Sequence, residues 1–136
     1  MKRFRIDEYV RWSDVDAAGV IFYGAYVRFF EIAESELLRS AGFPYSVLYD
    51  RFDCWLPRVK YTCEFRAPAR LDDLLHIDVW FNRLGRRSMT LAFEVEKAGE
   101  IRVADCEIVL VCVDRATFQS RALPEELRVA LAPFSA

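Results

Sequence analysis

Residues 23–42 read YGAYVRFFEIAESELLRSAG and carry the one long helical pattern of the chain. Large apolar residues recur there three and four positions apart, so we expect a helix from Tyr23 to Ala41 that is apolar over a wide arc. Gly42 stands where a left-handed residue commonly ends a helix, and Pro44 prevents the helix from resuming. Other parts of the chain must cover most sides of such a helix.

The segments on either side of this helix alternate apolar and polar residues with the period of a strand. Before the helix, one face of an extended segment carries Phe4, Ile6, Glu8, Val10 and Trp12. After it, the pattern predicts strands over residues 55–66, 75–82, 88–96 and 101–113, with a connection at 67–73 and a hairpin turn at 98–100.

Proline and apolar runs refine this assignment. Pro57 places its strand at an edge or a bulge, and the last strand becomes apolar on both faces from Ile108. Pro124, followed by two glutamates, starts a short C-terminal helix. We therefore expect an α+β fold, in which an antiparallel sheet of about five strands wraps around one long central helix.

The composition limits what the protein can be. A chain of 136 residues supports one domain, residues 1–136, yet 54% hydrophobic residues are more than a lone small domain hides, so part of this surface is expected in a subunit interface. The net charge of -2, from 19 basic and 21 acidic residues, creates no field that attracts nucleic acid or an anionic membrane. No stretch is apolar enough for a signal peptide or a membrane span, so we expect a cytoplasmic protein.

The cysteines and the single histidine give little support for a metal site. The four cysteines form no CxxC pair, and one histidine leaves few ligands for zinc. We interpret the cysteines as reduced, buried thiols and predict no metal.

Two carboxylates, Asp14 and Asp16, stand in the loop SDVDAAG at residues 13–19, just before the long helix. Unpaired backbone N–H groups and the helix dipole make this place electropositive, so a carbonyl group bound there would be polarised. The two carboxylates also repel each other, which favours a proton on one of them. Turn and capping chemistry is the alternative interpretation, whereas a calcium loop is disfavoured because Ala18 and Ala25 stand where ligands are needed.

Three segments resemble one known family. SDVDAAGVIFYGAYVRFFE at residues 13–31, the helix that ends at a glycine, and FRAPARLDD at 65–73 are similar to the 4-hydroxybenzoyl-CoA thioesterase-like branch of the hotdog superfamily, which includes the Tol-Pal-associated acyl-CoA thioesterases. The resemblance extends over nearly the whole chain, from the first strand to SRALPEEL at residues 120–127. It implies a single hotdog domain and an enzyme that hydrolyses an acyl-CoA thioester to a free acid and CoA.

The resemblance also implies roles for particular residues. Asp16 would be the catalytic carboxylate, as nucleophile or general base, while Asp14 supports the loop. The backbone N–H of Tyr23, with that of Gly24, would bind the thioester oxygen. Tyr23 stands where the Tol-Pal-associated group commonly has histidine, and Ala25 replaces a frequent asparagine.

Arg86, Arg87 and Ser88 offer two guanidinium groups and a hydroxyl at a junction between two strands. Such groups suit the phosphates of CoA, which is part of the substrate, so no separate cofactor is expected. A solvated turn is the alternative interpretation. We expect His76 to be structural or exposed, and Glu31 and Glu34 to face solvent or a subunit contact.

Two other functions remain open from the sequence. One is an acyl-CoA-binding or scaffold protein without catalysis, and the other is a hydratase or dehydratase, which would need a histidine beside the acid. Hotdog subunits pair so that active sites form between protomers, so we expect a homodimer or a dimer of dimers, that is, a homotetramer. Acyl length, aromatic preference and the choice between CoA and acyl-carrier-protein donors stay open.

Overall fold

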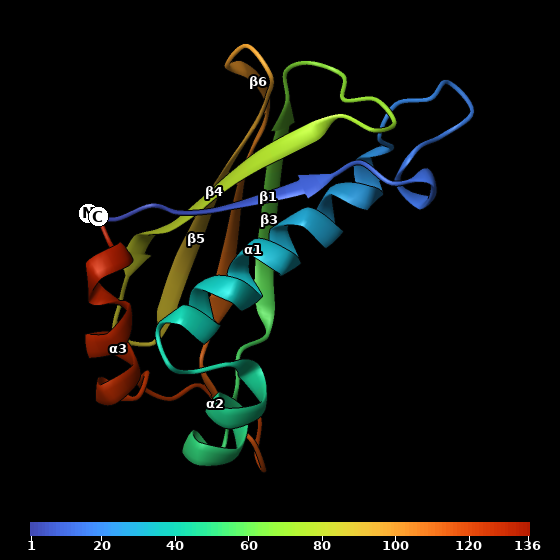
Figure 1. Ribbon diagram of the computed structural model, residues 1–136. Helices are drawn as coiled ribbons and strands as arrows, with labels where there is room; N and C mark the ends of the chain where they lie inside the picture. Colours follow the sequence, from blue (N-terminus) through green and yellow to red (C-terminus); the bar gives the residue numbers. More distant parts are fainter.

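The long apolar helix α1, Tyr26–Ser40, lies across the concave face of a strongly curved sheet (Figure 1). The computed structural model describes residues 1–136. The main sheet has five antiparallel strands in the order β1-β4-β5-β6-β3. Their bounds are β1 Phe4–Tyr9, β3 Arg58–Phe65, β4 Leu74–Leu84, β5 Ser88–Lys97 and β6 Ile101–Val111. The predicted sheet of five strands around one central helix is confirmed.

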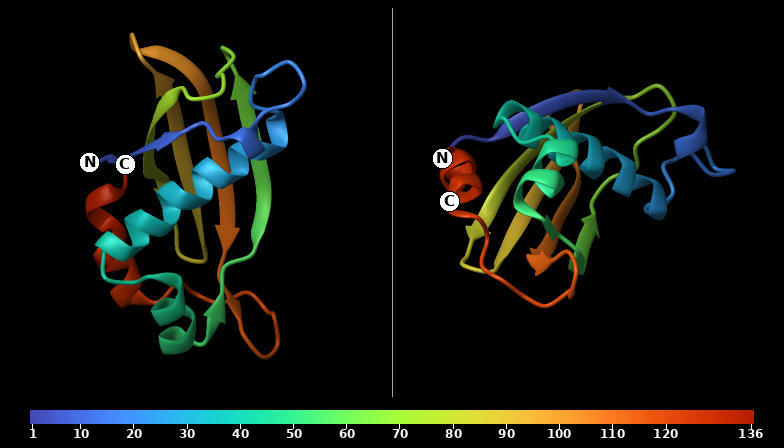
Figure 2. Two further views of the ribbon diagram at one scale, coloured as in Figure 1. Left: turned by 45° about the vertical axis from the view of Figure 1, so that its right-hand side comes forward. Right: turned by 90° about the horizontal axis from the view of Figure 1, so that it is seen from below.

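Shorter elements complete the chain around this sheet. Two short strands form a separate antiparallel pair, and two short helices and three 3₁₀ turns connect or close the structure. Their bounds are β2 Cys54–Trp55, β7 Val113–Asp114, α2 Tyr45–Phe52, α3 Glu125–Leu131, η1 Trp12–Asp14, η2 Tyr23–Ala25 and η3 Ala132–Phe134. Figure 2 shows both chain termini at the same end of the molecule, where the Lys2 N–H donates to the Pro133 carbonyl at 2.8 Å.

The core forms between α1 and the inner faces of β4, β5 and β6. Phe29, Phe30, Ala33, Leu37 and Leu38 of α1 are all buried, as the helical spacing predicted. Opposite them, alternate residues of the strands are buried, and the Phe30 and Phe93 rings lie 4.8 Å apart. Gly42 has a φ of +92°, which confirms the left-handed end of the helical region.

Several predicted boundaries were wrong. The helix predicted from Tyr23 begins with the turn η2 and becomes α-helical at Tyr26, and the strand predicted over residues 101–113 ends at Val111, before β7. The first strand ends at Tyr9, and Trp12 lies exposed in η1, because the chain turns where the Arg11 N–H donates to the Asp14 carboxylate at 2.7 Å. The strand predicted over residues 55–66 is two strands, interrupted at Pro57. Pro124 caps α3 from outside, and the helix starts one residue later.

Helix α2 was missed by the sequence analysis. Pro44 was interpreted only as the residue that stops α1. Its carbonyl also accepts hydrogen bonds at 2.9 Å from the N–H groups of Val47 and Leu48, so it begins a new helix. None of the helices is both long enough and apolar enough to cross a membrane. All four cysteines are free, and Cys63 alone among them is only partly buried.

Strand β3 is exposed along most of its length, and its edge position, with a bulge between Arg58 and Lys60, confirms the interpretation of Pro57. It is an edge strand, and Val59 and Phe65 are 60% and 51% exposed. The opposite edge, β1, instead places Arg5 and Asp7 toward solvent. Strand β3 also exposes Arg58, Lys60 and Glu64, but three of its exposed side chains are large and apolar, so it is the edge that favours pairing with another strand.

Candidate active site

The loop at residues 13–22 is a small hairpin fastened to the connection at residues 69–73. Val15 and Ile21 form a bridge inside the hairpin, and the Asp16 N–H donates to the Val20 carbonyl at 2.9 Å. The Ile21 N–H donates to the Ala69 carbonyl, also at 2.9 Å. The segment FRAPARLDD at residues 65–73 therefore includes the support on which the acidic loop rests.

Asp14 is the structural member of the acidic pair. Its side chain is buried, with the residue 2% exposed, and Arg28 of α1 binds it through two hydrogen bonds of 2.8 and 2.6 Å. The Arg11 N–H adds a third bond at 2.7 Å. Burial alone would raise the pKa of Asp14, but the hydrogen bonds from Arg28 and Arg11 hold its pKa below the ordinary value. Asp14 is therefore ionised at neutral pH and does not keep the shared proton that the sequence suggested for one of the pair.

Asp16 is exposed and only half engaged. One carboxylate oxygen, Oδ1, accepts a hydrogen bond from the Ala18 N–H at 2.9 Å, and the other has no partner in the chain. Gly19, with a φ of +78°, allows the tight turn that follows. Asp16 thus combines a fixed backbone with a free carboxylate oxygen, as a group that acts on a bound ligand requires.

Two backbone donors point out of the start of the helical region. The Ala25 N–H donates to the Phe22 carbonyl, whereas the N–H groups of Tyr23 and Gly24 have no acceptor in the chain. A hollow of about 450 Å³ opens beside them, lined by Tyr23, Gly24, Val27, Tyr61, Cys63 and Phe65. Asp16 lines none of the main hollows of the single chain. A cleft that includes Asp16 and these donors would need a further wall from outside the chain.

The turn with Arg86, Arg87 and Ser88 lies far from this loop in the same chain. The loop follows the end of β1 that pairs with Leu74, while the turn follows Leu84 at the other end of β4 (Figure 1). An 11-residue strand spans about 35 Å. The Arg87 guanidinium donates to the Ser120 carbonyl at 3.2 Å, and the Arg86 side chain has no partner.

The expectation that Glu34 faces solvent or a subunit contact was wrong. The residue is 3% exposed, and Arg58 of β3 holds both carboxylate oxygens at 2.6 Å. The Tyr45 hydroxyl donates to the same carboxylate, and burial together with the Glu34 charge raises the pKa of Tyr45. These side chains line a cavity of about 340 Å³ between α1, α2 and β3. Glu31, one turn earlier, is exposed as expected.

His76 lies on the outer face of the sheet, away from the helix. It contacts Asp7 of the neighbouring strand, with 2.6 Å between Nδ1 and Oδ1. Its side chain alternates with the buried Leu75 and Ile77, so it points away from the core. Tyr23 and Gly24 lie on the other side of the sheet, where the helical region begins. This agrees with a structural or exposed histidine.

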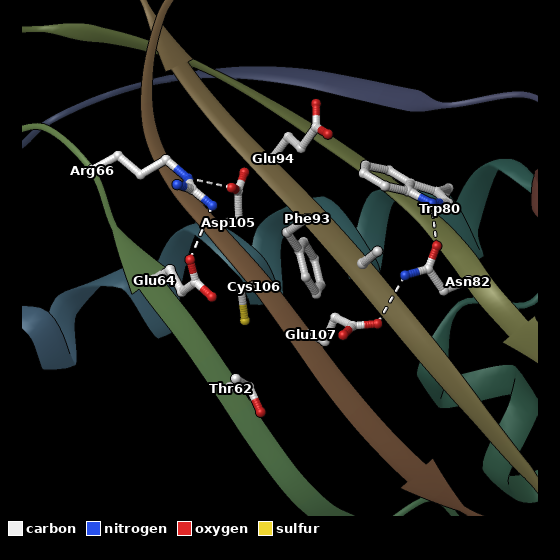
Figure 3. A pocket seen from close by; sticks show the side chains of 11 residues that line it. Thr62, Glu64, Arg66, Trp80, Asn82, Phe93, Glu94, Asp105, Cys106 and Glu107 are labelled. Atoms are coloured by element: carbon white, nitrogen blue, oxygen red, sulfur yellow. Dashed lines mark hydrogen bonds and ion pairs between the residues drawn. The ribbon is translucent and has the colours of Figure 1, made fainter.

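A third hollow, of about 180 Å³, lies on the outer face of the sheet (Figure 3). Its polar side chains largely bind one another. Asn82 donates to Glu107 at 2.8 Å and accepts from the Trp80 indole at 3.0 Å, and Arg66 pairs with Asp105. The backbone N–H groups of central strands are used within the sheet, so this hollow offers no free pair of donors like that at Tyr23 and Gly24.

Comparisons with known proteins place the chain among thioesterases. The profile of the thioesterase-like superfamily matches residues 10–131. The acyl-CoA thioester hydrolase YbgC of Escherichia coli O157:H7 is 34% identical, over 91% of this chain and 92% of its own. The structure of a 1,4-dihydroxy-2-naphthoyl-CoA thioesterase from Synechocystis, 21% identical, superimposes with a TM-score of 0.89 over 96% of both chains. That of BH1999 gentisyl-coenzyme A thioesterase, 30% identical, gives a TM-score of 0.82 over 93% of this chain and 98% of its own.

Replacing Asp14 with asparagine should lower the free energy of unfolding near neutral pH by about 2–4 kcal/mol, because Arg28 would lose its buried charged partner and keep as its charged partner only Glu8, at the longer distance of 3.4 Å. The folded-state pKa of Asp14 is depressed, so its stabilising contribution is complete above the ordinary aspartate pKa of about 3.9 and is lost as the pH falls through the folded-state value. Urea unfolding measured from about pH 7 down to about pH 3 should therefore show the two proteins converge in acid.

The matched control for this measurement is Asp53→Asn. Asp53 has an exposed side chain and a φ of +50°, a conformation that asparagine tolerates. A loss of stability as large in this control, or a difference for Asp14→Asn that does not change with pH, would contradict the assigned role of Asp14.

Proposed function

This chain belongs to the thioesterase-like superfamily, and on that premise we propose that it hydrolyses an acyl-CoA thioester to a free acid and CoA. The hotdog fold expected from the sequence is confirmed by the likeness to solved thioesterase structures. The observation that carries the proposal is the pair of unpaired N–H groups at Tyr23 and Gly24, next to a loop that presents Asp16 with one free carboxylate oxygen.

The chemistry follows from where charge develops. When the thioester carbon is attacked, its oxygen gains negative charge, and the two N–H groups stabilise that charge without reorganising. The Asp16 carboxylate either attacks the carbon, forming an anhydride that water then cleaves, or removes a proton from the attacking water. In both routes the carbon–sulfur bond breaks and CoA leaves as the thiolate, which takes up a proton.

A second copy of the chain completes the cleft in this proposal. Two β3 edges that pair antiparallel about a two-fold axis would extend the sheet across the interface and bury Val59 and Phe65. The same operation sets the far end of the partner sheet beside the loop that carries Asp16. A dimer of dimers, the homotetramer expected from the sequence, would repeat this unit.

The dimer also gives the arginine turn a role. Arg86, Arg87 and Ser88 lie about a strand length from Asp16 in their own chain, so they would contact the CoA phosphates of a substrate held at the partner's Asp16. Arg86 is the more available of the two guanidinium groups, because Arg87 already binds Ser120. The proposal retains the cytoplasmic location expected from the sequence and requires no further cofactor.

A hydratase or dehydratase has less support in the observed geometry. Such an enzyme needs a histidine near the acid, and His76 lies on the outer face of the sheet, engaged with Asp7. A binding protein without catalysis would not need the free oxygen of Asp16 or the unpaired donors of Tyr23 and Gly24. A thiol-release assay across a panel of acyl-CoAs distinguishes these functions, because only the thioesterase frees CoA.

Asp16→Asn should reduce kcat for acyl-CoA hydrolysis by at least about 10²-fold, because asparagine can neither attack nor accept the proton of water. Its amide oxygen can still accept the hydrogen bond from Ala18, so folding should be preserved. Thiol release and thermal unfolding are measured together, with Asp50→Asn, an exposed carboxylate on α2, as the control. Near-normal turnover of Asp16→Asn would refute the assignment.

Arg87→Glu should raise the KM for acyl-CoA by roughly tenfold, which corresponds to about 1.4 kcal/mol, because a positive charge beside the phosphates becomes negative. Steady-state kinetics test this, with Arg39→Glu, an exposed position at the end of α1, as the control. An unchanged KM would show that Arg87 does not bind the nucleotide end of the substrate, and an unchanged KM for Arg86→Glu as well would exclude the arginine turn from that role.

Val59→Asp should convert the dimer to a monomer and abolish turnover, because two-fold pairing of β3 would bury the introduced charges in the interface. Sedimentation velocity gives the oligomeric state, and Val129→Asp, on the exposed side of α3, serves as the control. A wild-type protein that is monomeric and active would contradict the shared cleft.

A further inference from the structure

Two hollows lie one after the other along α1, from the free N–H groups to the buried Glu34, and together we call them the acyl groove. The hollow at Tyr23 and Gly24 and the cavity at Glu34 share two lining residues, Val27 and Tyr61. Helix α1 forms one wall and the edge strand β3 forms the other. The two hollows therefore adjoin at Val27, near the start of α1, so a ligand held by the Tyr23 and Gly24 amides lies next to the entrance of the cavity.

The walls of this groove are mostly apolar, with Glu31 as the charged residue that lines it before the far end. Val27 and Tyr61 line the middle, and Phe30 and Ile108 lie deeper, with the Phe30 and Tyr61 rings 6.3 Å apart. Deeper still, the Glu34 carboxylate and the Arg58 guanidinium form the polar end. Apolar walls of this kind bind hydrocarbon in preference to a charged or strongly hydrated group.

The length of the groove indicates an aliphatic acyl group. Glu34 follows Gly24 by ten residues, and a helix of that length spans about 15 Å. An extended chain advances roughly 1.2 Å per bond, since a residue of three backbone bonds spans at most about 3.6 Å, so about 12 bonds fill this distance. A single aromatic ring bound at the amides would leave the cavity beyond Val27 empty.

We propose that this groove holds the acyl chain of medium-length aliphatic acyl-CoA thioesters, with the Glu34–Arg58 pair as the end stop that limits chain length. The proposal rests on the proposed function and adds its substrate class. The carbonyl lies at the Tyr23 and Gly24 amides, and the chain passes between Val27 and Tyr61. Each methylene buried on the way should improve kcat/KM by about fourfold, until the chain reaches the ion pair.

The Glu34–Arg58 pair limits the length of the acyl chain because both of its charges are fully paired. Arg58 binds both oxygens of Glu34, and the Tyr45 hydroxyl donates to Glu34 while accepting from Arg58 at 3.0 Å. A methyl group that pushed into this cluster would break charged hydrogen bonds and replace none of them. A terminal carboxylate on the acyl chain is also disfavoured, because Glu31 adds a negative charge beside a pair that is neutral overall.

The first test narrows the middle of the groove. Val27→Trp should lower the ratio of kcat/KM for dodecanoyl-CoA to that for butanoyl-CoA by at least about tenfold, because the indole occupies the path of the longer chain. Val27 is 46% exposed on α1, so a larger side chain fits without disturbing the core. Val129→Trp places the same side chain at a 64% exposed position of α3 and should leave the ratio unchanged.

The second test moves the end of the groove. The double variant Glu34→Leu with Arg58→Met replaces the ion pair by apolar side chains of similar size, an exchange that buried pairs often tolerate. It should shift the preferred acyl chain from dodecanoyl toward hexadecanoyl. Circular dichroism and thermal unfolding confirm that the variant folds, and Val27→Trp remains informative should it not fold.

Binding of the product acid separates this proposal from the proposed function. Calorimetry with dodecanoate should show binding to the wild type and to Val129→Trp, and at least about tenfold weaker binding to Val27→Trp. Equal binding to all three proteins, or an unchanged selectivity ratio in Val27→Trp, would overturn the groove as the acyl site even if acyl-CoA is hydrolysed. Dodecanoate binding that weakens in Val27→Trp, in a protein that releases no CoA from any thioester, would support the groove and refute the enzyme.

Discussion

Everything else in this structure depends on removing the apolar face of one helix from water. Helix α1 is 15 residues long, and Phe29, Phe30, Ala33 and Leu37 are almost completely buried. A flat sheet could cover only one side of such a wide arc, so the five strands must curve around it. The curvature in turn decides which parts of the chain lie at the open edge between sheet and helix. The N–H groups and the carboxylate oxygen that have no partner in the chain are found there.

The start of the helical region is at this open edge, and its two free amides are a direct consequence of helix geometry. The first N–H groups of any helix lack acceptors within the helix. At Tyr23 and Gly24 no other group of the chain accepts a hydrogen bond from these N–H groups. The Asp14–Arg28 ion pair ties the preceding loop to α1, so the loop cannot move independently of these amides. One carboxylate of the Asp-x-Asp pair therefore fixes the geometry and leaves the other free.

The spacing of apolar residues predicted the helix and the strands because each of these elements must bury one face. It placed α1, four long strands after it and the glycine at its end. It did not predict that Val59, Tyr61 and Phe65 stay exposed, since they alternate as buried residues do, although Pro57 indicated an edge or a bulge. It also missed α2, because Pro44 both ends one helical region and begins another. The distance between Asp16 and Arg86 depends on sheet order, which local patterns do not contain.

The burial of Glu34 is the feature least explained by stability. Removing a carboxylate and a guanidinium from water costs several kcal/mol per ion, and apolar side chains of the same size would commonly serve the core as well. The helical spacing placed Glu34 among residues that face the core, between Ala33 and Leu37, and the chain met the cost with two bonds from Arg58 and one from Tyr45. A fully paired cluster of this kind is rigid and resists apolar groups. Those properties suit the closed end of a mostly apolar groove. There the ion pair fixes how far a bound chain can extend, a role that does not depend on its contribution to the free energy of folding.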